Sequence, residues 1–146
     1  METQNRLFIS LNTKKAITPI YSYPLAMGYD LFAGEAVTIL AGRKAFVDTG
    51  VSVQVPEGMY GLTSSRINVN GIEFHPMICG PYDSHRIRIF LTNHSAIDYN
   101  IKYGDRIAGL NIIPMQSPII SIQQQLTETE NHQHQHQDQD QDQEIR

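Results

Sequence analysis

The chain has 146 residues, a length that suits one domain and leaves no room for a second sizeable core. Its charges are divided unevenly: residues 123–146 carry six acidic residues and one basic residue, whereas residues 1–122 carry nine acidic and ten basic residues. A nearly neutral body argues against the broad basic surface that is typical of nucleic-acid-binding proteins. We therefore expect no nucleic-acid partner.

The sequence also carries no sign of secretion or membrane insertion. Cys79 is the only cysteine, so no intrachain disulfide can form, and the N-terminal residues show no basic segment followed by an apolar one. No run approaches the roughly 18 apolar residues that span a bilayer. These features predict a location in the reducing cytosol or nucleus and no membrane partner.

Alternating apolar and polar residues predict half-buried strands over residues 51–55, 87–91 and 97–101. Turn-forming residues separate these segments, and no segment carries a convincing apolar stripe at helical spacing. The residues that break the pattern are Pro24, Gly34, Gly42, Pro56, Gly58, Gly80, Pro81 and Gly104. Many short strands with little helix predict an all-β sandwich, barrel or jelly roll formed by residues 1–122.

From Gln123 onward, glutamine alternates with histidine or aspartate, and large apolar residues are almost absent. Such a segment cannot bury enough surface to offset its ordering entropy, so residues 123–146 are predicted to form a disordered acidic tail. His132, His134 and His136 leave open an adventitious zinc or nickel site or the capture of a partner. Three histidines in a flexible tract nevertheless form no preformed coordination sphere, and we assign no metal ligand.

Three ordered blocks carry a resemblance to a known family. They read AMGYDLFAGEAVTILAG at 26–42, VDTGVSVQVPEGMYGLTSSR at 47–66 and YGDRIAGLNIIP at 103–114. Their order and spacing resemble the trimeric dUTPase family. The resemblance implies a β jelly roll that assembles as a homotrimer, in which each active site combines segments from different subunits. It also suggests a viral source.

The first and fourth family motifs are present as Gly28, Tyr29 and Asp30, and as Gly104 and Asp105. The family places the aspartate of the first motif near the metal-bound triphosphate, so Asp30 is a candidate phosphate-site residue. The alternative is that Asp30 only accepts backbone hydrogen bonds in a turn. Asp105 is expected to stabilise a turn rather than take part in chemistry.

The second motif is present as Gly58, Gly61 and Arg66, but Ile67 follows Arg66 where the family has serine. A hydroxyl that would donate to phosphate is therefore missing. The resemblance leaves two roles for Arg66, which are holding an anion and pairing with an acid at a subunit contact. Gly109, after the fourth motif, replaces a glutamine that the family places near the phosphates.

The third motif departs most from the family. Counted back without gaps from Asn93, Gly80 stands at the position of the general-base aspartate and Asp83 at that of the tyrosine that packs under deoxyribose. Tyr82 is one position early, and in a strand this shift would turn its ring to the opposite face. No confident catalytic residue remains. Asp83 is a substitute base only if the loop rearranges, and Tyr82 and Asp83 contact nucleotide only if binding is retained.

The family's glycine-rich C-terminal arm, with its arginine and aromatic residue, has no counterpart after Pro118. These losses favour the hypothesis that the protein has lost dUTP pyrophosphatase activity and acts as a scaffold or regulator with a protein partner. The alternative is an active Mg²⁺-dependent dUTPase that hydrolyses dUTP to dUMP and pyrophosphate, with Asp83 or His85 supporting the water. A third hypothesis keeps nucleotide binding without hydrolysis. No cofactor is expected unless the enzyme is active, in which case Mg²⁺ is.

Overall fold

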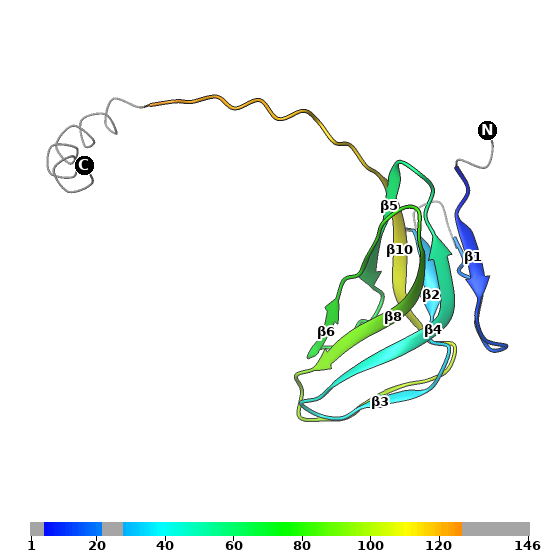
Figure 1. Cartoon of the computed structure of the whole chain (residues 1–146). Coiled ribbons are helices and arrows are strands. Elements are labelled where there is room, and N and C mark those ends of the chain that lie inside the picture. The colour runs from blue at the N-terminus through cyan, green and yellow to red at the C-terminus, as the bar shows by residue number, and fades with distance from the viewer. Residues whose placement is uncertain (1–4, 22–27, 127–146) are drawn as a thin grey trace, which may run out of the picture. The chain divides into compact units, whose positions relative to one another are not determined.

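The computed structural model describes residues 5–21 and 28–126 of the chain. Contacts divide the chain into two units, Met1–Gln116 and Ser117–Arg146. The described part of the first unit contains ten β-strands and no α-helix, and Figure 1 shows the long strands β4 and β8 side by side. The prediction of an all-β fold with little helix is confirmed.

The strands form two antiparallel four-stranded sheets and one antiparallel pair. The first sheet has the order β1 (Phe8–Leu11), β4 (Lys44–Gln54), β8 (Ser84–Asn93) and β6 (Ile72–His75). The second sheet has the order β2 (Tyr29–Phe32), β10 (Arg106–Pro114), β5 (Met59–Ser65) and β7 (Ile78–Cys79). The pair consists of β3 (Val37–Ile39) and β9 (Tyr99–Ile101).

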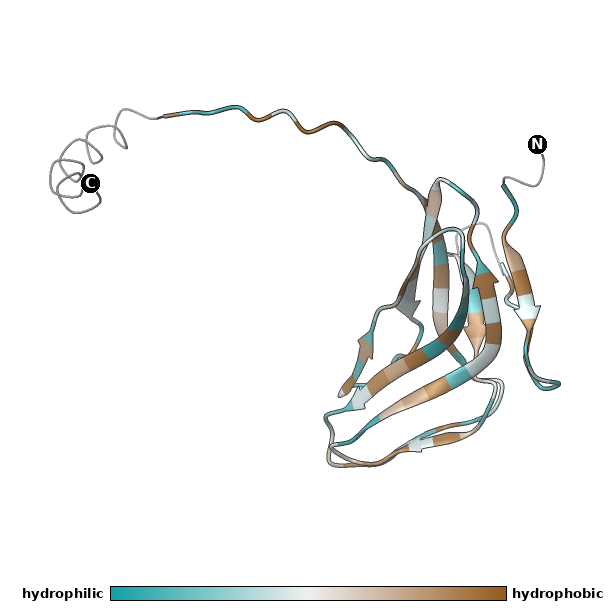
Figure 2. Ribbon diagram, in the orientation of Figure 1, coloured by the Kyte–Doolittle hydropathy of each residue, from teal (hydrophilic) through white to brown (hydrophobic). Residues whose placement is uncertain are grey.

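The core is built from the alternate residues that the sequence pattern singled out. Val51 and Val53 of β4 and Ile87, Ile89 and Leu91 of β8 are buried, and the same alternation is visible as colour bands in Figure 2. They form one cluster with apolar residues of the second sheet, which include Leu31, Ala108 and Leu110. Burying both sheets' apolar faces against one another is what stabilises a sandwich of this kind.

One predicted strand begins later than its pattern indicated. Ile97 was expected in the strand over residues 97–101, but it is 75% exposed and β9 begins at Tyr99. Asn93 and Ser95 explain the difference, because the Ser95 hydroxyl donates to the Ile97 carbonyl at 2.8 Å and the Asn93 amide donates to the same carbonyl, also at 2.8 Å. These bonds fix a turn over the first residues of the predicted strand.

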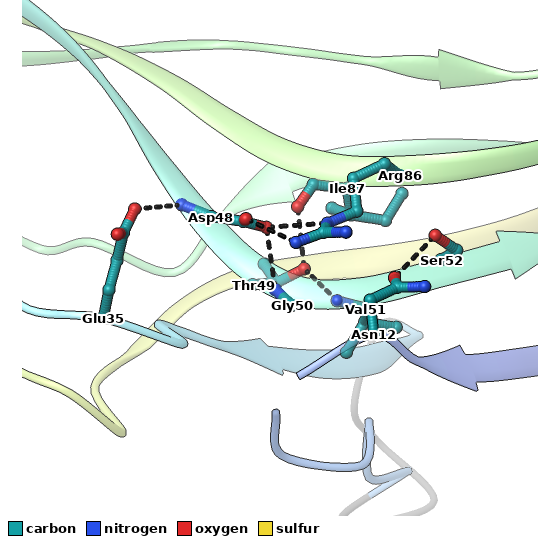
Figure 3. A network of polar contacts seen from close by, with 9 residues as sticks. All are labelled: Asn12, Glu35, Asp48, Thr49, Gly50, Val51, Ser52, Arg86 and Ile87. Atoms are coloured by element: carbon teal, nitrogen blue, oxygen red, sulfur yellow. Dashed lines mark hydrogen bonds and ion pairs between the residues drawn. The ribbon is translucent and has the colours of Figure 1, made fainter. Parts of the chain in front are cut away.

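A bulge interrupts the pairing of β4 with β8 between Asp48 and Ser52. Figure 3 shows the side chains that replace the missing ladder bonds: the Thr49 hydroxyl donates to the Ile87 carbonyl at 2.7 Å and accepts from the Val51 amide at 3.2 Å. Such bulges bend a strand and increase its twist.

Gly28, at the start of the first family motif, is required by the close approach of β2 to β10. Its φ of +89° lies in the left-handed region, and a Cβ at this position would overlap the Leu110 carbonyl group and the Asn111 side chain. Only glycine meets both demands. This contact places the following residues Tyr29 and Asp30 beside β10.

Of the second unit, residues 117–126 are described, and they form no helix or strand. Ile119, Ile120 and Ile122 are each at least 85% exposed. The predicted disorder of 123–146 falls mainly on residues 127–146, which lie outside the described ones, as do the tail histidines. The predicted boundary at residue 122 stays a prediction. In the described ranges there is no helix of the length and hydrophobicity needed to cross a membrane.

Candidate functional site

The pairing of β2, β10 and β5 brings three of the family motifs to one row of the second sheet. Asp30 of β2 is paired with Gly109 of β10, and Gly109 is paired with Ser64 of β5. Neighbouring strands lie about 4.8 Å apart, so residues far apart in the sequence become close neighbours here. Arg66, just after β5, and Arg106, at the start of β10, flank this row.

The Asp30 side chain is the anionic centre of the row. It is only 4% exposed, and each carboxylate oxygen faces a guanidinium group. Arg66 Nε lies 3.4 Å from Oδ1, and Arg106 Nη1 lies 3.5 Å from Oδ2. One buried carboxylate facing two arginines leaves the site with a net positive charge, which suits an anionic ligand. Asp30 lies in strand β2, with backbone bonds to Ile20 on its other side.

The Arg66 side chain lies along the surface of the sheet, where it reaches Asp30 of β2 and Ser64 of β5. Its side chain is 19% exposed, and Nη1 donates to the Ser64 hydroxyl at 3.2 Å. Its backbone amide donates to the Ile107 carbonyl at 3.0 Å, which anchors the residue to β10. The resemblance allowed two roles for Arg66, holding an anion or pairing with an acid at a subunit contact. In the structure Arg66 pairs with an acid, Asp30, that belongs to the same chain. We name Asp30, Ser64, Arg66 and Arg106 the arginine–aspartate cluster.

The third-motif loop lies at another edge of the same sheet. Cys79 of β7 is paired with Gly61 at the beginning of β5, and Gly80 follows it. The His85 ring donates from Nε2 to the Gly80 carbonyl at 3.1 Å, which ties β8 to this loop. A Cβ added at Gly80 would meet no atom within 4 Å, so the position at which the sequence predicts the family's general base to be missing faces open space.

Tyr82 and Asp83 are both exposed in this loop, and Tyr82 is 70% exposed. Tyr82 has a φ of 80°, the one positive value recorded for a residue other than glycine in the described ranges. Its hydroxyl lies 3.4 Å from a Glu57 carboxylate oxygen. The ring lines a shallow cleft of about 230 Å³ whose other walls are Arg6, Phe8 and residues 54–57. The ring is therefore turned toward β1 and the turn after β4.

The loop and the arginine–aspartate cluster do not meet within one chain. Gly61 precedes Ser64 by three residues on β5, which corresponds to about 10 Å along the strand, and Asp30 lies two strands further across the sheet. A site that used both would need the loop of another subunit. This geometry agrees with the shared active sites that the resemblance implies.

The remaining motif residues have structural surroundings. Tyr29 packs against Tyr21, with ring centroids 5.3 Å apart. The Gly58 carbonyl accepts the Met115 amide at 2.9 Å, and Gly61 faces Leu110 and Cys79. In the turn before β10, the Asp105 carboxylate accepts the Lys102 amide at 2.9 Å and the Gly104 amide donates to Ala33.

The described residues do not offer a direct site for a divalent cation. They contain no group of three or more His, Cys, Asp or Glu side chains arranged to hold a metal ion. The Asp30 carboxylate faces two guanidinium groups, which would repel a cation. Magnesium commonly binds to proteins through one or two carboxylates together with substrate phosphates and water.

Two features of the site were not found from the sequence. Ser64 belongs to no family motif that the sequence singled out, but it stands two residues before Arg66, and alternate residues of an extended segment point to the same side. Arg106 follows the fourth-motif residues Gly104 and Asp105, and the sequence assigned it no role. Its contact with Asp30 depends on the pairing of β2 with β10, which no local pattern reveals.

Solved structures of phage enzymes have the same fold. The dUTPase of Staphylococcus bacteriophage 80alpha matches with a TM-score of 0.74 and 24% identity, over 84% of this chain and 99% of that chain. The dUTPase of phage phi11 of S. aureus, described with a structural Mg(II) ion, matches with a TM-score of 0.71 and 24% identity, over 83% and 98% of the two chains. The fold is therefore the jelly roll of dUTPases.

Sequence comparison extends this result from fold to family. The dUTPase family model matches residues 14–138. The deoxyuridine 5'-triphosphate nucleotidohydrolase of Candida albicans is 35% identical over 113 residues, covering 75% of this chain and 71% of the relative. That of Saccharomyces cerevisiae is 35% identical over 107 residues, covering 71% and 73%. The chain belongs to the dUTPase family.

Proposed function

We propose that this protein binds dUTP and hydrolyses it to dUMP and pyrophosphate. The observation that carries the proposal is the arginine–aspartate cluster, which collects parts of three family motifs into one positively charged site. Sequence relatives at 30–35% identity are named for this reaction, which favours the active alternative over the loss of activity that the altered motifs suggested.

In the reaction, the oxygen of a water molecule attacks the α-phosphorus, the bond from that phosphorus to the bridging oxygen breaks, and pyrophosphate leaves. Arg66 and Arg106 are suited to neutralise charge on the phosphates. The proton of the water needs an acceptor. Since Gly80 cannot supply one, we assign this role to Asp83, which is an exposed carboxylate on the same loop.

The proposal requires more than one subunit, because the loop and the cluster lie apart within one chain. We propose a homotrimer, as is usual for the family. With 16.5 kDa per chain, a trimer has a mass of about 50 kDa in solution. Light scattering that gave a monomer mass would contradict shared sites.

The direct test is to incubate the full-length protein with dUTP and Mg²⁺ and to measure dUMP and pyrophosphate. We expect turnover above about 1 s⁻¹, the lower end of the usual enzyme range. dCTP and dTTP serve as matched substrates that carry the same triphosphate. Absence of pyrophosphate release from dUTP at high protein concentration would contradict the proposal.

A second candidate function is a non-catalytic scaffold or regulator that uses the dUTPase fold to bind a protein. One specific observation favours it: Gly80 has no side chain to act as a base, and no atom fills the space that a side chain would occupy. Calorimetry with a non-hydrolysable dUTP analogue separates the cases. Binding without turnover would identify a nucleotide-binding protein, and no heat at all would favour the scaffold. The cytosolic or nuclear location and the viral source stay predictions.

A further inference from the structure

The arrangement of the cluster depends on a residue that has no side chain of its own. Gly109 lies between Asp30 and Ser64 on the central strand β10, and the guanidinium group of Arg66 lies directly over it. A Cβ at Gly109 would come within 2.5 Å of Arg66 Cζ and 2.8 Å of Nη1, and closer still to Nη2. No side chain larger than hydrogen fits beneath the arginine in this position.

Because Gly109 has no side chain, the sheet surface has a slot at this position. In the slot, Arg66 Nε reaches the Asp30 carboxylate at 3.4 Å and Nη1 reaches the Ser64 hydroxyl at 3.2 Å. Both partners project from strands that are paired with Gly109, one on each side.

A free arginine side chain samples many rotamers, and fixing one of them when a ligand binds costs conformational entropy. A slot that holds the side chain in one rotamer before the ligand arrives removes this cost from binding. Only 19% of the Arg66 side chain is exposed, so the slot and its two partners restrict most of the side chain. We infer that Gly109 is a positioning residue that preorganises Arg66 for the triphosphate of the nucleotide. The inference rests on the proposed function only for the identity of the ligand.

The first experiment needs no ligand. In a two-dimensional ¹H–¹⁵N spectrum, the Nε–H signal of Arg66 is identified by its loss in R66K. We expect Gly109→Ala to move this signal toward the position of solvent-exposed arginines. We also expect G109A to lower the melting temperature, and the double variant R66A/G109A to melt at the same temperature as R66A, because the clash partner is gone. Two results would overturn the slot. One is an Arg66 Nε–H signal that G109A leaves unchanged. The other is a double variant whose melting temperature lies below that of R66A by as much as G109A lowers that of the wild type.

The second experiment measures the affinity for a non-hydrolysable dUTP analogue by calorimetry. We expect G109A and R66A each to weaken binding about tenfold, and R66A/G109A to bind no more weakly than R66A, since the two changes act through one guanidinium group. Additive losses in the double variant, or wild-type affinity in G109A, would overturn the positioning role. If the wild-type protein itself fails to bind the analogue, the proposed function fails, while the spectrum and the melting temperatures still decide the slot.

Discussion

Arg86 of β8 holds Asp48 of β4 through two hydrogen bonds, from Nε to Oδ1 at 3.1 Å and from Nη2 to Oδ2 at 2.7 Å. Figure 3 shows the pair at the bulge, where Asp48 Oδ1 also accepts the Gly50 amide at 2.8 Å and the Asp48 amide donates to Glu35 at 3.0 Å. The hydrogen bond from Arg86 is the largest influence on Asp48 and lowers the pKa of its carboxyl, and the pKa of Arg86 is raised in return.

This pair predicts how stability responds to acid. Because the folded-state pKa of Asp48 is depressed, its contribution is fully present above the ordinary aspartate pKa of about 4 and is lost as the pH falls through the lower folded value. We expect Asp48→Asn to lower the melting temperature by a few degrees at pH 7, and the difference from wild type to shrink below about pH 4.

The matched control for this prediction is Arg86→Lys, which keeps the positive charge but loses the two-pronged geometry. We expect its melting temperature at pH 7 to lie between those of wild type and D48N. A difference between D48N and wild type that stayed constant from pH 7 to pH 3 would show that the ion pair does not supply the stabilisation.

Asn93 lies at the end of β8, and we expect its substitution to destabilise the fold more than that of an exposed polar residue. It is fully buried, its amide donates to the carbonyls of Ile39 and Ile97, and its carbonyl accepts from the backbone amide of Ser95. Asn93→Ala leaves several buried groups without partners, so we expect a loss of about 3 kcal/mol in the free energy of unfolding. Urea denaturation measures this loss.

Asn100 supplies the control for Asn93. Its carbonyl accepts one hydrogen bond, from Thr38 at 2.7 Å, and the contact is exposed. We expect Asn100→Ala to cost no more than about 0.5 kcal/mol, as for most surface substitutions. Equal losses in the two variants would contradict the importance assigned to burial.

The proposed base predicts a specific loss of activity. Asp83→Asn removes the carboxylate but keeps the shape, so we expect kcat to fall by about 10² to 10⁴, with little change in the affinity for a non-hydrolysable analogue. The matched control is Glu73→Gln on strand β6, which also replaces a carboxylate by an amide of the same shape. We expect this variant to retain the wild-type kcat. Wild-type turnover in D83N together with a loss in His85→Gln would transfer the role to His85.

Cys79 should be protected from thiol reagents. Its side chain is fully buried, and burial raises the pKa of the thiol, so little reactive thiolate is present. We expect a thiol-reactive dye to label the native protein at least about 100-fold more slowly than the urea-unfolded protein. Equal labelling rates in the two conditions would show that β7 opens readily and exposes the thiol.

The alternating patterns at 51–55 and 87–91 predicted buried strands because neighbouring side chains on a strand point to opposite faces, a purely local rule. The same rule was wrong for Ile97, where hydrogen bonds from Asn93 and Ser95 form a turn. The bulge near Gly50 was not predicted, since it depends on which residues of β8 stand opposite β4.

The sequence by itself determined the family and the all-β class, because motif order and hydrophobic alternation are local features of the chain. It also predicted, by counting back without gaps from Asn93, that Gly80 stands at the family's general-base position, and this stays a prediction. Only the tertiary structure decided that Asp30, Ser64, Arg66 and Arg106 form one cluster and that the slot at Gly109 admits an arginine. The physical reason is that strand pairing brings together residues up to 76 positions apart, and local sequence does not encode their register.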